Sequence, residues 1–346
     1  MNLHLQAISK HTMTEEKMCA AKSGREWNYD LLRFFAIFQV VLQHVSMRYG
    51  GVFATSCIAF SKTTIPLFVM LSGAFIIADG KNGDYRLFFN TKTKRLIIAT
   101  IVWSVIYVAF TYTMLFYKNG WPLPLGTLIT PLKQWAAGYP FYHLWFLYMF
   151  AGVYAVAPVF IWIREKVDER NFAVASAAVV LLMIPTGMFS RLFWVIKFVP
   201  FLGYFMLGYT LRCVFTRRVS EVLLIAVAAL SLGITIYILR CNPWWLPDKI
   251  SSALLNYQSA TIFVAAVCLF KFFGQIKVRG GEWLYQLSKH SFNVYLLHPM
   301  VISTILITVP HEILKSSPVV IIPLMTLAVM GVCYAVSIFL IRKRML

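Results

Sequence analysis

Long apolar runs dominate the chain and constrain its fold more than any other feature. A helix needs about 20 predominantly apolar residues to cross the hydrocarbon core of a bilayer. Only 13% of the 346 residues are charged, against about a quarter in a soluble domain. Runs of suitable length lie at 30–47, 54–78, 96–116, 142–163, 172–189, 198–215, 220–239, 252–273, 291–309 and 318–341. The sequence therefore predicts an all-α membrane bundle of about ten transmembrane helices, with a tail at 1–28 and a membrane domain at 29–346.

The distribution of Lys and Arg predicts the orientation of these helices. With the N-terminus inside, 22 of the 32 Lys and Arg residues fall in cytoplasmic segments and nine fall outside. Cytoplasmic loops carry an excess of positive charge, so both termini and the tail at 1–28 are predicted to be cytoplasmic. The same bias accounts for the net charge of +19 without a nucleic-acid partner. The Trp- and Pro-rich outer loop at 242–248 is predicted to anchor the chain at the interface or to line an acceptor entrance.

The first apolar run carries a polar stripe formed by Asp30, Arg33 and His44. The eleven residues from Arg33 to His44 make three helical turns plus about 20°, so both side chains share one face, about 16 Å apart along the axis. An ionisable group at membrane depth costs a few kcal/mol and marks a functional candidate. The alternative for His44 is a neutral imidazole that is bonded to a neighbouring helix.

Other polar side chains in or beside the runs are weaker candidates. His143 and Trp145 open the fourth run at its outer end, where they could meet an acceptor or anchor the helix at the interface. His298 precedes Pro299, which frees a backbone carbonyl one turn earlier, so hydrogen-bonded packing competes with chemistry there. Ser72 and the glycine after it favour a small-residue helix contact.

A basic segment leads into the third run. Lys92 and Arg95 are one helical turn apart, and they could anchor the chain to anionic lipid or bind the phosphates of a cytosolic cofactor. No carboxylate lies in the middle of a run, which weakens the case for a proton-coupled pump. The cysteines show no metal-binding spacing, so no metal is expected.

Taken together, these segments resemble acyltransferase family 3, the integral-membrane acyltransferases that mostly O-acetylate surface glycans. The resemblance covers nearly the whole chain after residue 27. Its first three elements are an Arg-x10-His pattern from Arg33 to His44, a Phe-x-x-Ser-Gly-Phe pattern that ends at Phe75 with Ala74 in place of an aromatic residue, and an Arg-x-x-Arg pattern with Lys92 in first place. The blocks that begin at His143 and at Ser291 also resemble recurrent blocks of the family.

The resemblance implies an acyl-CoA donor, most simply acetyl-CoA, and an acceptor hydroxyl on a cell-surface or lipid-linked glycan, at a bacterial inner membrane. We expect His44 to act as general base, because an imidazole with an ordinary pKa near 6.5 suits that task. An acyl-histidine relay is left open. The remaining roles are expected to be donor or oxyanion binding at Arg33, orientation of Arg33 by Asp30, cofactor binding at Lys92, Arg95 and Ser72, and acceptor binding at His143, Trp145 and His298.

Two rival functions use the same membrane bundle. A transporter or flippase for a glycan or lipid-linked sugar would suit about ten helices with aromatic outer loops, but it needs no CoA. A non-catalytic partner of a synthase complex would not depend on His44. The basic segment at Lys92 and Arg95, together with His44, favours the acyltransferase.

Overall fold

The computed structural model describes residues 24–120, 124–186, 196–241, 254, 256–314 and 316–342. Within these ranges the backbone forms helices and no strand, which confirms the all-α prediction. Most of the predicted tail at 1–28 and the outer loop at 242–248 lie outside the described residues. The boundary between tail and membrane domain stays a prediction.

The helices follow the apolar runs closely. The main helices are α2 (Trp27–Ser46), α3 (Gly51–Ser61), α4 (Thr64–Ile76), α6 (Lys94–Asn119), α7 (Leu125–Ala136), α8 (Trp145–Lys166), α9 (Glu169–Thr186), α10 (Leu202–Tyr209), α11 (Glu221–Cys241), α13 (Ala260–Gln275), α14 (Glu282–Thr308) and α16 (Pro318–Arg342). The short elements are η1 (Gly80–Gly83), α5 (Tyr85–Phe88), η2 (Phe89–Thr93), η4 (Val199–Phe201), η5 (Thr210–Val214) and α15 (His311–Leu314).

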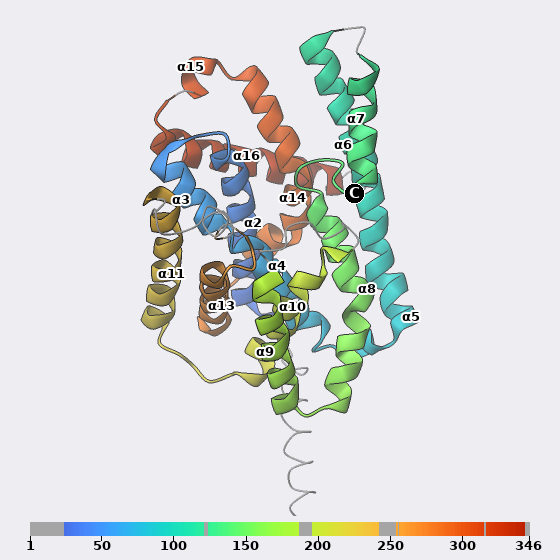
Figure 1. Cartoon of the computed structure of the whole chain (residues 1–346), viewed down its shortest axis with the longest axis vertical. Helices are drawn as coiled ribbons and strands as arrows, with labels where there is room; N and C mark the ends of the chain where they lie inside the picture. The colour runs from blue at the N-terminus through green and yellow to red at the C-terminus, as the bar shows by residue number, and fades with distance from the viewer. Residues whose placement is uncertain are drawn as a thin grey trace, which may run out of the picture.

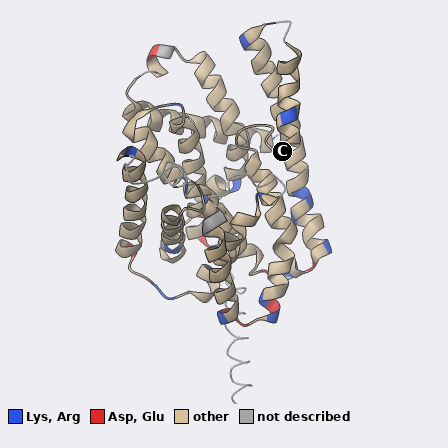
Figure 2. Ribbon diagram, viewed as in Figure 1, with Lys and Arg blue, Asp and Glu red and all other residues tan. Residues whose placement is uncertain are grey.

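Six helical segments of the described chain are long and apolar enough to cross a membrane. They are Gly51–Ile76, Tyr85–Asn119, Trp145–Lys166, Glu221–Cys241, Glu282–Thr308 and Pro318–Arg342. Few charged residues lie along these helices (Figure 2). The chain is an integral membrane protein, while the count of about ten spans and the cytoplasmic termini stay predictions.

Helix α2 lies in the middle of the bundle (Figure 1) and packs against α3, α4, α13, α14 and α16. Its buried side chains include both polar and apolar residues. A helix with polar side chains at several depths is costly to expose to lipid. The surrounding helices therefore keep the polar stripe of α2 inside the protein.

A break at Lys62 and Thr63 divides the second predicted run into α3 and α4. The buried amide of Gln39 on α2 holds this break. Its Nε2 donates to the Phe60 carbonyl at 2.9 Å, and its Oε1 accepts from the hydroxyls of Thr63 and Thr64 at 3.2 and 3.3 Å. Because a side chain of α2 bonds the Phe60 carbonyl and both threonine hydroxyls, these polar groups of the break have partners inside the bundle.

Helices α4 and α10 cross at glycines. A Cβ added to Gly73 would lie 1.7 Å from the Phe205 carbonyl oxygen, and one added to Gly208 would lie 1.9 Å from that of Met70. No side chain larger than glycine fits at either crossing point. The small-residue contact predicted beside Ser72 is thus present, and it holds α4 close to α10.

Candidate functional site

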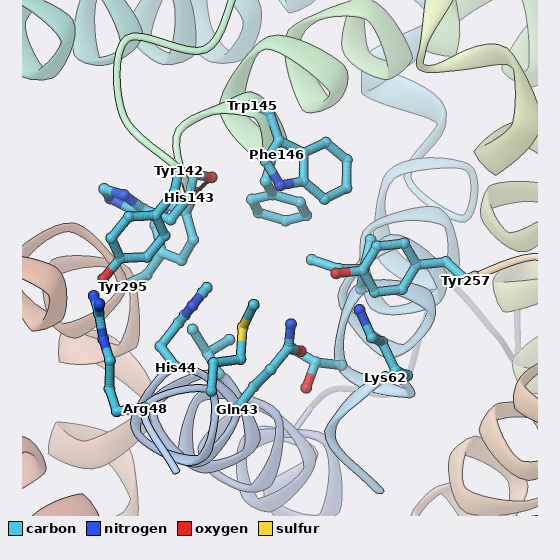
Figure 3. Close-up of a pocket in the computed structure, with 14 residues that line it drawn as sticks. Gln43, His44, Arg48, Lys62, Tyr142, His143, Trp145, Phe146, Tyr257 and Tyr295 are labelled. Atoms are coloured by element: carbon cyan, nitrogen blue, oxygen red, sulfur yellow. Dashed lines mark hydrogen bonds between the residues drawn. The ribbon is translucent and has the colours of Figure 1, made fainter. Parts of the chain in front are cut away.

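Side chains of α2 line two cavities. The larger one, named here the outer cavity, surrounds His44 (Figure 3). It has a volume of about 510 Å³. Its walls come from α2, the α3–α4 break, the start of α8 and the segment before α13. They are formed by Val40, Gln43, His44, Met47, Arg48, Lys62, Thr64, Ile65, Tyr142, His143, Trp145, Phe146, Tyr257 and Tyr295. The set includes aromatic rings and two cations, and it contains no carboxylate.

Two imidazoles, those of His44 and His143, line this cavity, and a third, that of His298, contacts both of them. The ring of His44 stacks on that of His298, with centroids 5.1 Å apart. The His143 ring lies edge-on to His298 at 5.4 Å, and the Tyr142 ring lies 4.9 Å from His44. The histidines come from α2, α14 and the residues just before α8, so the fold brings together the three histidines that were singled out from the sequence. No group of three or more His, Cys, Asp or Glu residues in the described ranges could hold a metal ion.

The tautomer of His298 follows from its neighbours. Its Nδ1 lies 2.7 Å from the carbonyl oxygen of Tyr295 and 3.2 Å from that of Val294. A carbonyl can only accept a hydrogen bond, so Nδ1 carries the proton and Nε2 carries the lone pair. Pro299 leaves the Tyr295 carbonyl without its helical donor, and the imidazole takes that place. Nε2 is buried and has no hydrogen-bond partner among the described residues.

His143 is also buried and incompletely bonded. It is 2% exposed, and neither ring nitrogen has a hydrogen-bond partner. Its backbone carbonyl accepts from the Tyr295 hydroxyl at 2.6 Å, and the Tyr107 ring lies 4.7 Å from its own. Buried polar atoms usually have partners. The ring nitrogens of His143 and Nε2 of His298 are exceptions to this rule among the described residues.

A second cavity, named here the inner cavity, surrounds Arg33 and has a volume of about 300 Å³. Its lining includes Ser72, which the sequence had placed with the cofactor, and Tyr154. The other residues of the lining are Phe68, Leu71, Phe75, Ile76, Leu96, Phe146, Leu147, Phe150, Ser291, Phe292 and Tyr295. One cation in an otherwise uncharged, largely aromatic cavity suits a ligand with a polar group inside an apolar chain.

The carboxylate of Asp30 holds Arg33 in place. Asp30 is 2% exposed, and its Oδ1 accepts from Arg33 Nη1 at 2.9 Å and from the Ser288 hydroxyl at 2.6 Å. Arg25 adds a two-pronged contact, with Nε 2.5 Å from Oδ2 and Nη2 3.1 Å from Oδ1. The remaining donors of the Arg33 guanidinium are not used by Asp30 and are available to a ligand in the inner cavity.

Two side chains, Phe146 and Tyr295, line both cavities. The centroids of their rings are 5.4 Å apart. They form a shared wall, defined here by these two residues, between the Arg33 and His44 ends of α2. The outer and inner cavities are therefore neighbours separated by the thickness of aromatic side chains.

Lys92 lies just before α6 and Arg95 lies in its first turn. Neither residue lines the outer or the inner cavity. Lys92 belongs to the π-helical turn η2, with its Nζ 5.7 Å from the centroid of the Phe88 ring, and Arg95 is exposed. Leu96, the residue after Arg95, does line the inner cavity. The basic segment thus lies beside the inner cavity and contributes no charged group to it.

Sequence reasoning gave no role to several residues that line the cavities. Tyr295 precedes His298 by three residues, so a helix puts both on one face, and this spacing is the signal that could have identified it. Arg48 follows His44 by one helical turn, which is the corresponding signal on the first run. Nothing in the sequence pattern singled out Tyr154 or Phe146 from the many aromatic residues of α8.

Comparison with known proteins identifies the family. A family model described as an acyltransferase domain, the third acyltransferase family, matches residues 26–338. No curated protein and no solved structure matches the chain. The matched range contains both cavities and every site residue predicted from the sequence. The chain therefore belongs to acyltransferase family 3, the membrane O-acyltransferases.

Proposed function

We propose that this protein moves an acyl group, most simply acetyl, from cytosolic acyl-CoA to a hydroxyl of a cell-surface or lipid-linked glycan. The observation that carries the proposal is the pair of cavities along α2. Arg33 lines one, His44 lines the other, and the two share a wall at Phe146 and Tyr295. Such an arrangement suits a donor and an acceptor that arrive from opposite sides of a bilayer.

The donor binds from the cytoplasmic side in this proposal, with both termini on that side. The positive-inside distribution of Lys and Arg supports this orientation, at a bacterial inner membrane. Lys92 and Arg95 bind the CoA phosphates at the surface. The pantetheine arm then extends past Leu96 into the inner cavity, where Arg33 and Ser72 bind its polar groups or the thioester oxygen.

His44 acts as the general base. It accepts the proton of the acceptor hydroxyl as the hydroxyl oxygen forms a bond to the thioester carbonyl carbon. The tetrahedral intermediate carries a negative oxygen, which the charge of Arg33 stabilises if the thioester lies at the shared wall. Its collapse breaks the carbon–sulfur bond, and the proton on His44 goes to the departing thiolate. The products are the acylated hydroxyl and free CoA.

His298 and His143 support the acceptor side. The fixed Nδ1 proton of His298 keeps its ring stacked on His44, which limits the orientations that the His44 ring can adopt. His143 offers its unpaired nitrogens to the acceptor, and Trp145 covers the cavity from the start of α8. These three residues hold the acceptor hydroxyl near His44.

Labelled acyl-CoA tests the proposal. Membranes that contain the protein should transfer label from acetyl-CoA to a glycan fraction, and membranes with His44→Ala should not. His290→Gln is the matched control, because His290 is a buried histidine bonded to Ser337, outside both cavities. Transfer by His44→Ala at the normal rate would contradict the role of His44. Glycan translocation without any labelled product would identify a transporter or flippase instead.

Label that remains on the protein decides between direct transfer and an acyl-histidine relay. Direct transfer predicts no labelled protein after donor is added without acceptor. A stable label on the wild type that His44→Ala removes would establish the relay and would replace the general-base step.

A further inference from the structure

A groove between α6 and α14 adjoins the outer cavity. It has a volume of about 350 Å³ and is lined by Arg48, Phe110, Thr111, Met114, Leu115, Lys118, Phe141, Ser303, Leu306 and Ile307. Both helices belong to segments that are apolar and long enough to cross a membrane. The hydrogen bond from the Tyr107 hydroxyl to the Leu296 carbonyl, at 2.6 Å, ties them together deeper in the bundle. The acyl-transfer proposal gives this groove no task.

Arg48 joins the groove to the outer cavity, since it lines both. Its guanidinium carbon lies 5.9 Å from the centroid of the Tyr142 ring. It follows His44 by four residues, about one helical turn. Figure 3 shows Arg48 and Lys62 on opposite sides of the outer cavity. A ligand bound at Arg48 can therefore extend into both spaces at once.

The charges at this junction are all positive. Arg48 and Lys118 line the groove, and no Asp or Glu lines either the groove or the outer cavity. In the part of the chain that the structure describes, neither cation forms a salt bridge with an acid. Two cations that line the same groove give it a positive charge that favours an anion, and the planar guanidinium of Arg suits contacts to a phosphate.

The rest of the groove is apolar. Six of its ten lining residues are aromatic or aliphatic, with Phe110, Met114 and Leu115 on α6 and Leu306 and Ile307 on α14. A hydrocarbon chain would bury its surface there with no polar group to desolvate. The outer cavity, by contrast, has Trp145, Tyr257 and unpaired histidine nitrogens, so it suits a hydroxyl-bearing head group.

We propose that the acceptor is a saccharide joined through phosphate to a long hydrocarbon tail, with the tail in the α6–α14 groove, the phosphate at Arg48 and Lys118, and the saccharide in the outer cavity. This inference rests on the proposed function and decides between its two classes of acceptor. It selects the lipid-linked saccharide, and it assigns a separate tail-binding site. An ordinary phospholipid would occupy the groove and leave the outer cavity unused, and a soluble glycan would do the reverse.

Binding to purified protein tests the site without catalysis. The probes are a long-chain polyprenyl monophosphate, the matching polyprenol, a short prenyl monophosphate, a polyprenyl phosphate that carries one sugar, and phosphatidic acid. Binding of each probe is measured as the shift that it causes in the thermal unfolding midpoint of the protein. The sugar-bearing polyprenyl phosphate should bind most tightly. The polyprenol and the short-chain phosphate should each bind about tenfold or more weakly than the long-chain phosphate, since one lacks the charge and the other the tail.

Two variants and their controls locate the site. Arg48→Gln combined with Lys118→Gln should weaken binding of the long-chain phosphate about tenfold or more. The matched control is Lys133→Gln on α7, an exposed lysine outside the groove and both cavities. Met114→Trp should fill the groove and remove the advantage of the long tail. Leu327→Trp is its control, because Leu327 is exposed on α16, outside the groove.

The outcomes separate this inference from the proposed function. Three results would each overturn the inference. The Arg48 and Lys118 double variant could bind the long-chain phosphate as tightly as the wild type does, or the wild type could bind the short-chain phosphate as tightly as the long-chain one. Phosphatidic acid could also bind as tightly as the sugar-bearing lipid. Acyl transfer to a soluble glycan that Met114→Trp leaves unchanged would overturn it while the proposed function stands. Binding of the sugar-bearing lipid with no acyl transfer to any acceptor would overturn the proposed function and leave the lipid site intact.

Discussion

The two cavities along α2 differ in how fully their polar groups are bonded. At the inner cavity, Asp30 accepts from Arg25, Arg33 and Ser288, so its charge is compensated before any ligand binds. At the outer cavity, the ring nitrogens of His143 are buried without partners among the described residues, and so is Nε2 of His298, whose ring contacts His44 and His143. A buried polar atom without a partner costs about 1–3 kcal/mol. The charged group at the proposed donor side thus already has its partners, while the proposed acceptor side keeps buried polar atoms without partners among the described residues.

The largest effect is expected from His44→Ala. Loss of the proposed general base should lower turnover by about 10²–10⁴-fold, and the affinity for acyl-CoA should stay near that of the wild type because the donor is proposed to bind at the other cavity. Single-turnover rates with acetyl-CoA, together with donor binding by calorimetry, measure both quantities. A parallel loss of donor affinity would show that the two cavities do not act separately.

A smaller loss is expected when the ring next to His44 is altered. His298→Ala removes the imidazole that stacks on His44 and should lower kcat by about 10²-fold, the effect of misplacing a catalytic group by about 1 Å. His298→Gln retains a buried polar group and should recover part of the loss. The donor KM is the control measurement, and it should not change in either variant. A rise in donor KM with unchanged kcat would move His298 from the acceptor side to the donor side.

Asp30→Asn tests the pre-built inner cavity. It leaves Arg25 and Arg33 without their buried counter-charge, so the guanidinium of Arg33 is no longer fixed and the donor KM should rise about tenfold. The kcat at saturating donor should change less than in His298→Ala. The folded protein should also unfold at a lower temperature, because the amide weakens the charge-assisted hydrogen bonds that Asp30 accepts from Arg25 and Arg33. Ser288→Ala, which removes only a hydroxyl contact to Asp30, should show a weaker version of both changes.

The smallest effect is expected from the basic segment outside the cavities. Lys92→Ala combined with Arg95→Ala should raise the donor KM several-fold at low salt, and the difference should shrink as ionic strength rises because surface charges are screened. Lys94→Ala is the matched control, since Lys94 is an exposed lysine between the two. If the double variant leaves the donor KM unchanged, the segment does not bind the donor and its basic residues serve as a membrane anchor.

The local geometry of α2 was predictable, and its partners were not. Helical periodicity placed Asp30, Arg33 and His44 on one stripe, and the 2.9 Å contact from Arg33 to Asp30 agrees with that spacing. The neighbourhood of His44 and His298 depends on how α2 packs against α14, more than 240 residues later in the chain. A single sequence gives no measure of such a contact.

The break between α3 and α4 had a sequence signal that the hydropathy pattern concealed. Two threonines precede Pro66, and Thr or Ser followed by Pro in the first turn is typical of a helix start. The uninterrupted apolar composition instead predicted one run at 54–78. The residue that stabilises the break, Gln39, lies on another helix, so the pairing could not be read from the segment itself.

The wall formed by Phe146 and Tyr295 has a consequence for the cell that contains this protein. If donor and acceptor approach from opposite sides, these two rings lie between the two cavities and interrupt a water path along α2 at that point. An acyl group is small enough to be transferred at the edge of the Phe146 and Tyr295 rings. A hydrated ion is larger and would pass only if both rings moved away together. The same side chains that bring the substrates within reach of each other would thus preserve the membrane potential during turnover.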